Sequence, residues 1–189
     1  QSPYRDWYIW SRDNPGYKSP WGSVAWHKSP VRDEYYYGIF SQGMPDLNYR
    51  NPAVTAEAKK ISAFWLNDMG ADGFRLDAIP YLCERDGTIN ENLPETHAVL
   101  RYLRAELDKH YSNRFFLAEA NQWPEDVREY FGDGDECQMA YHFPLMPRIY
   151  MAVAQEDRHP IIDIMAQTPD IPENCQWAIF LRNHDELTL

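Results

Sequence analysis

The sequence indicates an α/β protein whose core is a parallel sheet. Short apolar segments alternate with amphipathic helical segments from residue 51 onward, and this alternation implies parallel strands joined by helical crossovers. The segment 114–119 carries the continuous apolar character of a strand covered on both faces. We therefore expect strands at 72–80, 114–119, 138–143 and 177–181.

The helices are predicted from caps and periodicity. Asn51 is an N-cap followed by Pro52 at the first helical position, and Gly70 ends that helix. Further helices are expected from Pro94, over 124–131, over 148–154 and over 161–166. The apolar spacing of the first two rests on Val54, Ile61, Phe64, Trp65 and Met69, and on Leu100, Leu103 and Leu107.

Residues 1–43 differ from the rest of the chain. They are rich in Trp, Tyr, Pro, Ser and Gly and lack helical periodicity, so irregular structure with short strands, near 31–40, is expected. Because the chain begins with Gln1 rather than Met, we interpret it as a piece of a longer protein.

Composition excludes several function classes. The 189 residues carry a net charge of −11, which argues against nucleic-acid and anionic-membrane partners. No apolar run spans a bilayer and no signal peptide opens the chain. Three scattered cysteines favour reduced thiols in the cytoplasm and give no zinc site. The 15% aromatic content suits sugar binding, with simple core packing as the alternative.

The stretch 72–80 (DGFRLDAIP) organises the chain. On a strand of period two, Arg75 and Asp77 share one face, and the guanidinium lowers the pKa of the carboxylate, which keeps Asp77 ionised. An anionic Asp at the carboxyl end of a buried strand suits a nucleophile. A helix cap held by a structural ion pair is the alternative.

Glu119 and Asp185 follow two other predicted strands. Carboxyl ends of parallel strands converge at one face, and paired carboxylates are the groups that glycoside chemistry uses. Glu119, after an apolar strand and away from a predicted cation, is the better proton donor. Asp185 would hold sugar hydroxyls with His184. A surface cap at Glu119 and a local turn at 183–185 are the alternatives.

These residues carry a family resemblance. Residues 73–77 (GFRLD), 118–120 (AEA) and 183–185 (NHD) resemble three signature regions of the α-amylase family, the family 13 glycoside hydrolases, and 44–48 (MPDLN) resembles its auxiliary motif near the end of an inserted domain. Residues 81–88, 92–97, 119–124, 141–148 and 180–189 resemble members that isomerise maltose to trehalose.

The resemblance implies a partial (β/α)8 TIM barrel, about strands four to seven, over residues 51–189, preceded by the tail of an inserted domain over 1–50. It implies a retaining mechanism in which Asp77 forms a covalent glucosyl-enzyme, Glu119 is the acid/base and Asp185 stabilises the transition state. Arg75 and His184 would bind substrate. The expected substrates are maltose and trehalose, and the chemistry requires no cofactor. An α-glucosidase or α-amylase type hydrolase and a non-catalytic homologue are the alternatives.

The resemblance also suggests calcium. Asp46 and Glu84 would supply carboxylates, and Tyr81 and Leu82 backbone carbonyls, all hard oxygen ligands; ordinary loop acids are the alternative. The first signature region of the family is absent from this chain. We therefore expect the isolated chain to be inactive, and either to belong to a larger protein or to associate with another copy as a homo-oligomer.

Overall fold

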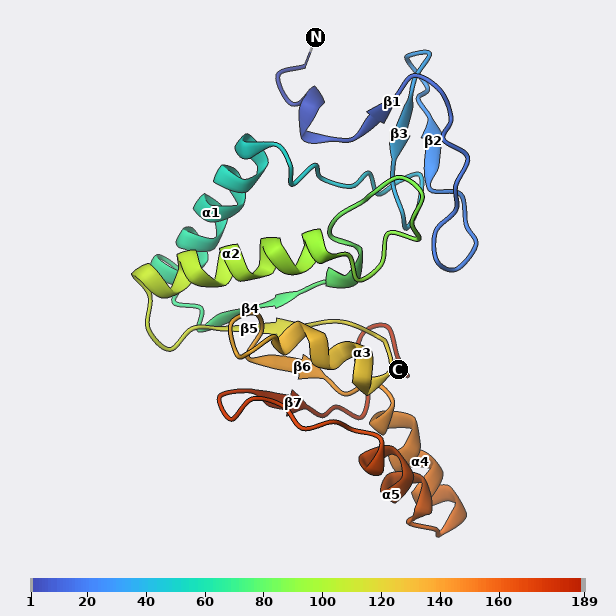
Figure 1. Cartoon of the computed structure of the whole chain (residues 1–189), viewed down its shortest axis with the longest axis vertical. Coiled ribbons are helices and arrows are strands. Elements are labelled where there is room, and N and C mark those ends of the chain that lie inside the picture. Colours follow the sequence, from blue (N-terminus) through green and yellow to red (C-terminus); the bar gives the residue numbers. More distant parts are fainter. Residues whose placement is uncertain (1, 188–189) are drawn as a thin grey trace. The chain divides into compact units, whose positions relative to one another are not determined.

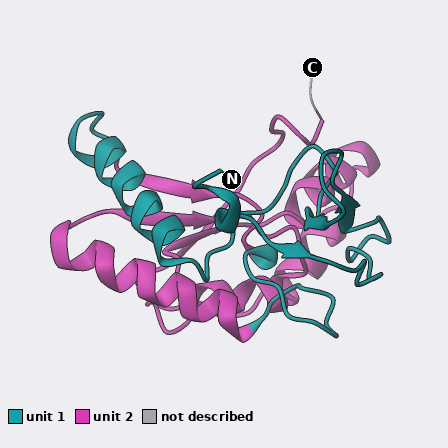
Figure 2. Cartoon of the chain, turned by 90° about the horizontal axis from the view of Figure 1, so that it is seen from above, with its two compact units in different colours: residues 1–71, 80–93 teal, residues 72–79, 94–189 magenta. Residues whose placement is uncertain are grey.

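The computed structural model describes residues 2–187, which fall into two compact units (Figures 1 and 2). Unit 1 comprises Gln1–Ala71 and Pro80–Leu93, and unit 2 comprises Asp72–Ile79 and Pro94–Leu189. Residues 188 and 189, which end the last predicted motif, lie outside the described residues. The predicted division, with the tail of an inserted domain over residues 1–50 and part of the barrel over 51–189, stays a prediction.

Unit 1 contains a small antiparallel sheet with short strands, as its Pro- and Gly-rich sequence predicts. A 3-10 helix (Arg5–Trp7) precedes β1 (Trp10–Ser11), and β3 (Tyr35–Tyr37) pairs with both β1 and β2 (Trp26–Lys28). The core of this unit is formed by four buried residues, Ala25, Trp26, Tyr37 and Ile39. β3 lies within the segment 31–40 for which a strand was predicted.

Helix α1 (Pro52–Asn67) begins where the sequence predicts. The side chain of Asn51 accepts a hydrogen bond from the backbone N–H of Ala53 at 3.0 Å, which satisfies one of the free donors at a helix N-terminus. The helix ends three residues before Gly70, whose φ is 72°. Only Val54 and Leu66 of this helix are buried, and much of its apolar stripe is exposed: Ile61, Phe64, Trp65 and, just beyond its end, Met69.

Unit 2 contains a parallel sheet of four strands in chain order, β4-β5-β6-β7, which Figure 1 shows stacked one beside the next. The strands are β4 (Gly73–Leu76), β5 (Phe115–Ala118), β6 (Met139–Tyr141) and β7 (Gln176–Ala178), and every neighbouring pair is parallel. This confirms the predicted α/β class. Within the described part of the chain, β4 and β7 are the edges of the sheet.

Helices follow each of the first three strands. They are α2 (Pro94–His110), α3 (Pro124–Arg128) continued by the 3-10 helix Glu129–Phe131, α4 (Leu145–Gln155) and α5 (His159–Ala166), with a further 3-10 turn at Ile79–Tyr81. Helix α4 begins three residues earlier than predicted, because Pro147 falls in its first turn, where the missing N–H of proline is tolerated. Among residues 2–187, no helix has the length and apolarity required to cross a bilayer.

Helix α2 is fixed to the sheet by a buried arginine. Leu100 and Leu107 are buried as predicted, whereas Leu103 is only half-buried, and Arg104 lies between Leu100 and Leu107 at 2% exposure. Its guanidinium donates to the carbonyl of Arg114 and to Oε1 of Gln138, both at 2.9 Å, and pairs with Asp108. A buried charge must be paired and hydrogen-bonded to be tolerated, so this network sets the position of α2 against the segments that enter β5 and β6.

Candidate active site

The register of the two neighbouring strands β4 and β5 brings Asp77 and Glu119 to one edge of the sheet. Leu76 pairs with Ala118, and the ladder continues for one more bond, from the N–H of Glu119 to the carbonyl of Leu76 at 3.0 Å. Asp77 and Glu119 are the next residues along their strands. The predicted convergence at the carboxyl ends of the strands is therefore confirmed for these two carboxylates.

The close approach of β4 to β5 depends on Gly73 at the start of the site strand. A Cβ at this position would overlap the carbonyl oxygen and the ring of Phe115, to which Gly73 is paired in the sheet. Glycine is the residue that allows such contact between backbones. The glycine that opens the predicted signature thus has a packing role that also sets the register at Asp77.

Arg75 bridges the two carboxylates. Its Nη1 donates to Oδ1 of Asp77 at 2.7 Å, and its Nη2 pairs with Oε1 of Glu119. The predicted pairing with Asp77 is confirmed, but the expectation that Glu119 lies away from a cation is wrong. The sequence shows only that Arg75 and Asp77 share a strand face; the pairing of β4 with β5 brings Glu119 to the same guanidinium.

The environments of the two carboxyl groups differ. The side chain of Asp77 is 72% exposed and that of Glu119 is 14% exposed. A hydrogen bond with Glu119, together with the charge and hydrogen bond of Arg75, lowers the pKa of Asp77. Burial, reinforced by the neighbouring Asp77, raises the pKa of Glu119. The two environments therefore move the pKa values apart, downward for Asp77 and upward for Glu119, which is the direction required of an anion and a proton donor.

Ala78 contributes a backbone donor that the sequence does not signal. Its φ is 47°, in the left-handed region of the backbone map, which residues other than glycine adopt only at an energetic cost. In this conformation its N–H donates to Oε2 of Glu119 at 3.2 Å. Glu119 thus has Arg75 on one oxygen and the N–H of Ala78 on the other, which fixes the orientation of the carboxyl group.

Asp185 and His184 lie in the loop after β7, farther from the strand than predicted. The expected strand over 177–181 ends at Ala178, because its partner β6 ends at Tyr141, the residue paired with Ala178. Nε2 of His184 lies 3.0 Å from Oδ2 of Asp185. His184 is near enough to Asp77 for its charge to lower the Asp77 pKa. The structure therefore places His184 within electrostatic range of Asp77 and pairs it with Asp185.

The turn at 183–186 is held by Asn183. Its Oδ1 accepts from the N–H groups of Asp185 at 2.9 Å and of Glu186 at 2.6 Å. The local turn that was the alternative interpretation of this segment is present, and it leaves the side chain of Asp185 63% exposed. The turn presents the carboxylate to solvent, and a role for Asp185 at a sugar stays a prediction.

A cluster of three aromatic rings, to which the sequence assigns no role at the site, includes a residue near Arg75. Tyr141, at the end of β6, is close enough to influence the pKa of Arg75. Its ring lies 5.9 Å from that of Phe143 and 5.5 Å from that of Phe180, and these two rings are 5.1 Å apart, all edge to face. Their sequence signal is their position, since Tyr141 ends β6 and Phe143 and Phe180 each follow the end of a strand by two residues.

The residues predicted to hold calcium lie in unit 1. Oδ2 of Asp46 accepts from the N–H of Ile39 at 2.8 Å, and burial raises the pKa of Asp46 to about 6. Burial, with a smaller contribution from the nearby Asp46, raises the pKa of Glu84, but Glu84 is already paired with Arg50. Tyr81 packs on Trp21 and Phe40. Oxygen ligands are present, but Arg50 supplies the cation that Glu84 needs, and residues 2–187 contain no cluster of three or more His, Cys, Asp or Glu suited to a metal.

The chain belongs to the alpha-amylase family, because the family model for the alpha amylase catalytic domain matches residues 1–188. It is similar to trehalose synthase/amylase TreS of Mycolicibacterium smegmatis, with 55% identity over 197 residues that cover 99% of this chain and 33% of that protein. It is 50% identical to trehalose synthase of Thermus thermophilus over 195 residues, 100% of this chain and 20% of that protein.

A solved structure agrees with the fold. The alpha-glucosyl transfer enzyme XgtA matches with a TM-score of 0.72 at 28% identity, over 98% of this chain and 40% of that chain. The chain therefore spans a third or less of the length of these two relatives and less than half of this structure. Together with the parallel sheet, these matches confirm the prediction of an α/β fold that forms part of a TIM-barrel catalytic domain.

Proposed function

We propose that the protein containing this chain isomerises maltose to trehalose through a covalent glucosyl-enzyme. The observation that carries the proposal is the bridge of Arg75 between an exposed Asp77, whose pKa is lowered, and a buried Glu119, whose pKa is raised. Retaining glycoside chemistry needs such a pair, close together and unlike in pKa. The relatives named trehalose synthase support the choice of reaction.

In the first step a carboxylate oxygen of Asp77 attacks the anomeric carbon of the non-reducing glucose of maltose. The bond to the glycosidic oxygen breaks, and Glu119 gives its proton to that oxygen, so glucose leaves as a neutral alcohol. Arg75 keeps Asp77 anionic before attack and faces the Glu119 carboxylate as it gains charge. His184 and Asp185 would hold the hydroxyls of the ring.

In the second step the released glucose turns within the site and presents its anomeric hydroxyl. Glu119, now a carboxylate, takes the proton of that hydroxyl. The hydroxyl oxygen of the glucose attacks the glucosyl carbon, and the bond from that carbon to Asp77 breaks. The product is trehalose and no water enters the balance. Water reaching the same intermediate would instead give glucose, so the site must exclude it.

The test is a product analysis with the full-length protein. Incubation with maltose should give trehalose as the main product, and Asp77→Asn should abolish turnover while leaving the unfolding temperature nearly unchanged. Glucose as the main product would establish the hydrolase instead, an activity that the name synthase/amylase of one relative also includes. Full activity of Asp77→Asn would remove the assigned nucleophile, and a wild-type protein without turnover would establish the non-catalytic homologue.

The remaining parts of the proposal are smaller. The chemistry needs no cofactor, and a calcium ion at Asp46 and Glu84 stays a prediction that requires Arg50 to move. Work in the cytoplasm is proposed from the sequence, whose three cysteines, Cys83, Cys137 and Cys175, are scattered and odd in number. Association with another copy is to be tested by the mass of the full-length protein in solution, and the isolated chain should show no turnover of maltose.

A further inference from the structure

A cavity of about 490 Å³ lies wholly within unit 1, and none of its lining residues belongs to the candidate catalytic set. Its volume falls in the range of small-molecule sites, roughly 300–1,000 Å³. One part of the lining is aromatic and comes from residues 9–26, and the other is charged and comes from Arg50 and the loop 84–86. The principal lining residues are Trp10, Tyr17, Trp26, Arg50, Glu84 and Asp86.

The aromatic part is held rigidly. Nε1 of Trp10 donates to the carbonyl of Arg5 at 2.9 Å, and the guanidinium of Arg5 lies over the Trp10 ring at 5.1 Å from its centroid. Tyr17 packs edge-on against Trp26 at 6.0 Å, and Trp26 is a core residue at 5% exposure. These rings keep their positions without a ligand, which lowers the entropic cost of binding one.

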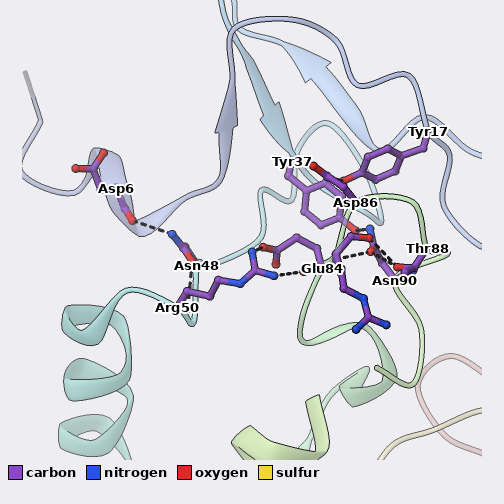
Figure 3. Close-up of polar contacts among 10 residues, drawn as sticks. Asp6, Tyr17, Tyr37, Asn48, Arg50, Glu84, Asp86, Thr88 and Asn90 are labelled. Carbon is purple, nitrogen blue, oxygen red and sulfur yellow. Dashed lines mark hydrogen bonds and ion pairs between the residues drawn. The ribbon is translucent and has the colours of Figure 1, made fainter. Parts of the chain in front are cut away.

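The charged part is equally fixed (Figure 3). Glu84 pairs with Nη1 of Arg50 through its carboxylate and accepts from Nη2 through its backbone carbonyl. The hydroxyl of Tyr17 donates to Oδ1 of Asp86 at 3.2 Å, as the close pair of side chains in Figure 3 shows. The cavity therefore offers acceptors and donors of both charge signs beside aromatic rings.

The loop that carries Glu84 and Asp86 is anchored from the core of unit 1. Asn90 is 2% exposed; its Oδ1 accepts from the N–H of Arg85 at 2.8 Å, and its Nδ2 donates to the hydroxyl of Tyr37 at 3.0 Å. A buried amide satisfied in this way gives the loop one geometry. The polar groups of the cavity are thus built on a rigid frame, as binding sites require.

We propose that this cavity binds a pyranoside through Trp10, Tyr17 and Asp86. A sugar ring has an apolar C–H face for the aromatic rings and neutral hydroxyls that can both donate and accept, which matches a lining of mixed charge. An anion would meet Glu84 and Asp86, and a purely apolar ligand would displace water from the exposed side chains of Arg50 and Asp86 without forming hydrogen bonds in its place. The choice of an α-linked glucose oligomer as the particular pyranoside rests on the proposed function.

The test is calorimetric titration of the full-length protein with maltotriose, in an Asp77→Asn background that prevents turnover. We expect two binding events. Adding Trp10→Ala should weaken one of them about tenfold or more and leave the other unchanged. Asp86→Asn, an isosteric change at an exposed residue, should weaken the same event. Tyr4→Ala is the matched control, because Tyr4 is an exposed aromatic residue of unit 1 outside the cavity lining.

A single binding event, or two events that neither Trp10→Ala nor Asp86→Asn alters, would overturn the proposal. The same outcome is expected if another segment of the full-length protein fills the cavity. Trp10→Ala that unfolds the protein leaves Asp86→Asn to decide. Failure of the proposed function has a different signature, since it appears as turnover in Asp77→Asn or as absence of trehalose and does not involve Trp10.

Discussion

The two units position their polar residues by different means. In unit 2, regular parallel strands bring Asp77 and Glu119 together from positions far apart in the chain. In unit 1, short strands carry aromatic rings, and side-chain bonds from residues such as Asn90 hold long loops in place. Position in unit 2 thus follows from backbone register, and position in unit 1 from individual side chains. Variants should therefore act through chemistry or buried charge in unit 2, and through single hydrogen bonds in unit 1.

The largest effect is expected at the buried acid of unit 2. Glu119→Gln should lower the turnover of maltose in the full-length protein by about 10³-fold or more, because glutamine cannot protonate the leaving oxygen. The rate of the first step should fall much less with an α-glucosyl fluoride, because its leaving group needs no proton. Single-turnover release of glucose and of fluoride checks this, because Glu119 is also the base of the second step and would limit the steady-state rate with either substrate. Equal losses in a single turnover would show that Glu119 is not the acid.

The pH profile sharpens the same point. Since the pKa of Asp77 is lowered and that of Glu119 is raised, activity should rise with pH as Asp77 ionises and fall as Glu119 loses its proton. Asp77 contributes to the raised pKa of Glu119, so Asp77→Asn should lower that pKa. The shift is measurable by titration of the carboxyl signal of Glu119, independently of turnover.

The next effect tests buried charge in unit 2. Glu136 is 1% exposed and pairs with Nδ1 of His97 at 2.8 Å and Nη1 of Arg101 at 2.7 Å. Glu136→Ala would leave both partners without their carboxylate and should cost about 3 kcal/mol of unfolding free energy. Denaturant unfolding, with hydrogen exchange on α2 as the local probe, measures the cost.

The control is an exposed pair of unit 1. Glu57 and Lys60 are joined at 3.0 Å, with side chains 41% and 75% exposed, and Glu57→Ala should change stability by less than about 0.5 kcal/mol. A comparable cost for Glu57→Ala and Glu136→Ala would contradict the view that burial, and not the presence of an ion pair, decides stability in unit 2.

The sequence predicts the periodic parts of both units and less of what depends on pairing. The cap at Asn51, the strand at 73–76 and the order of the parallel strands follow from local chemistry and from alternation. The second partner of Arg75 and the early end of β7 do not, because each depends on which strand lies next in the sheet. The left-handed conformation of Ala78 has no local signal at all, since nothing but the site around it selects that conformation.

The unit 1 loops show the same limit in another form. Composition predicts irregular, aromatic structure over residues 1–43, but the contact of Tyr17 with Asp86 joins residues 69 positions apart through two side chains. Periodicity carries no information on such a pair. The predicted calcium ligands show the consequence. The sequence gives no sign that Glu84 has a partner, whereas in the structure it is paired with Arg50.

A smaller effect is expected at Asp46 of unit 1. Burial raises its pKa from 3.8 to about 6 in the folded state, so the folded protein holds this proton more tightly than the unfolded chain does. The resulting stabilisation is fully present below pH 3.8 and is lost as pH rises through about 6. Asp46→Asn removes this titration. Relative to that variant, the wild type should therefore lose about 1–3 kcal/mol between acid and neutral pH.

The measurement is denaturant unfolding of both proteins across this pH range, with hydrogen exchange at Ile39 as the local probe, because its N–H donates to Asp46. A difference between the two proteins that does not change with pH would show that Asp46 has an ordinary pKa. It would also remove the argument that single buried side chains hold the loops of unit 1.

The smallest effect separates two bonds of one residue in unit 1. Asn51 accepts from the N–H of Ala53 and also donates through Nδ2 to the carbonyl of Asp6 at 2.8 Å. Asn51→Ala loses both bonds and should cost about 1 kcal/mol. Asn51→Asp keeps the acceptor at the helix N-terminus, where the helix dipole favours its charge, and loses only the donor. We expect Asn51→Asp to cost less than Asn51→Ala, with hydrogen exchange in the first turn of α1 as the measurement. If the two variants cost the same, the bond to Asp6 is the one that matters, and the start of α1 is held by the preceding loop and not by its own cap.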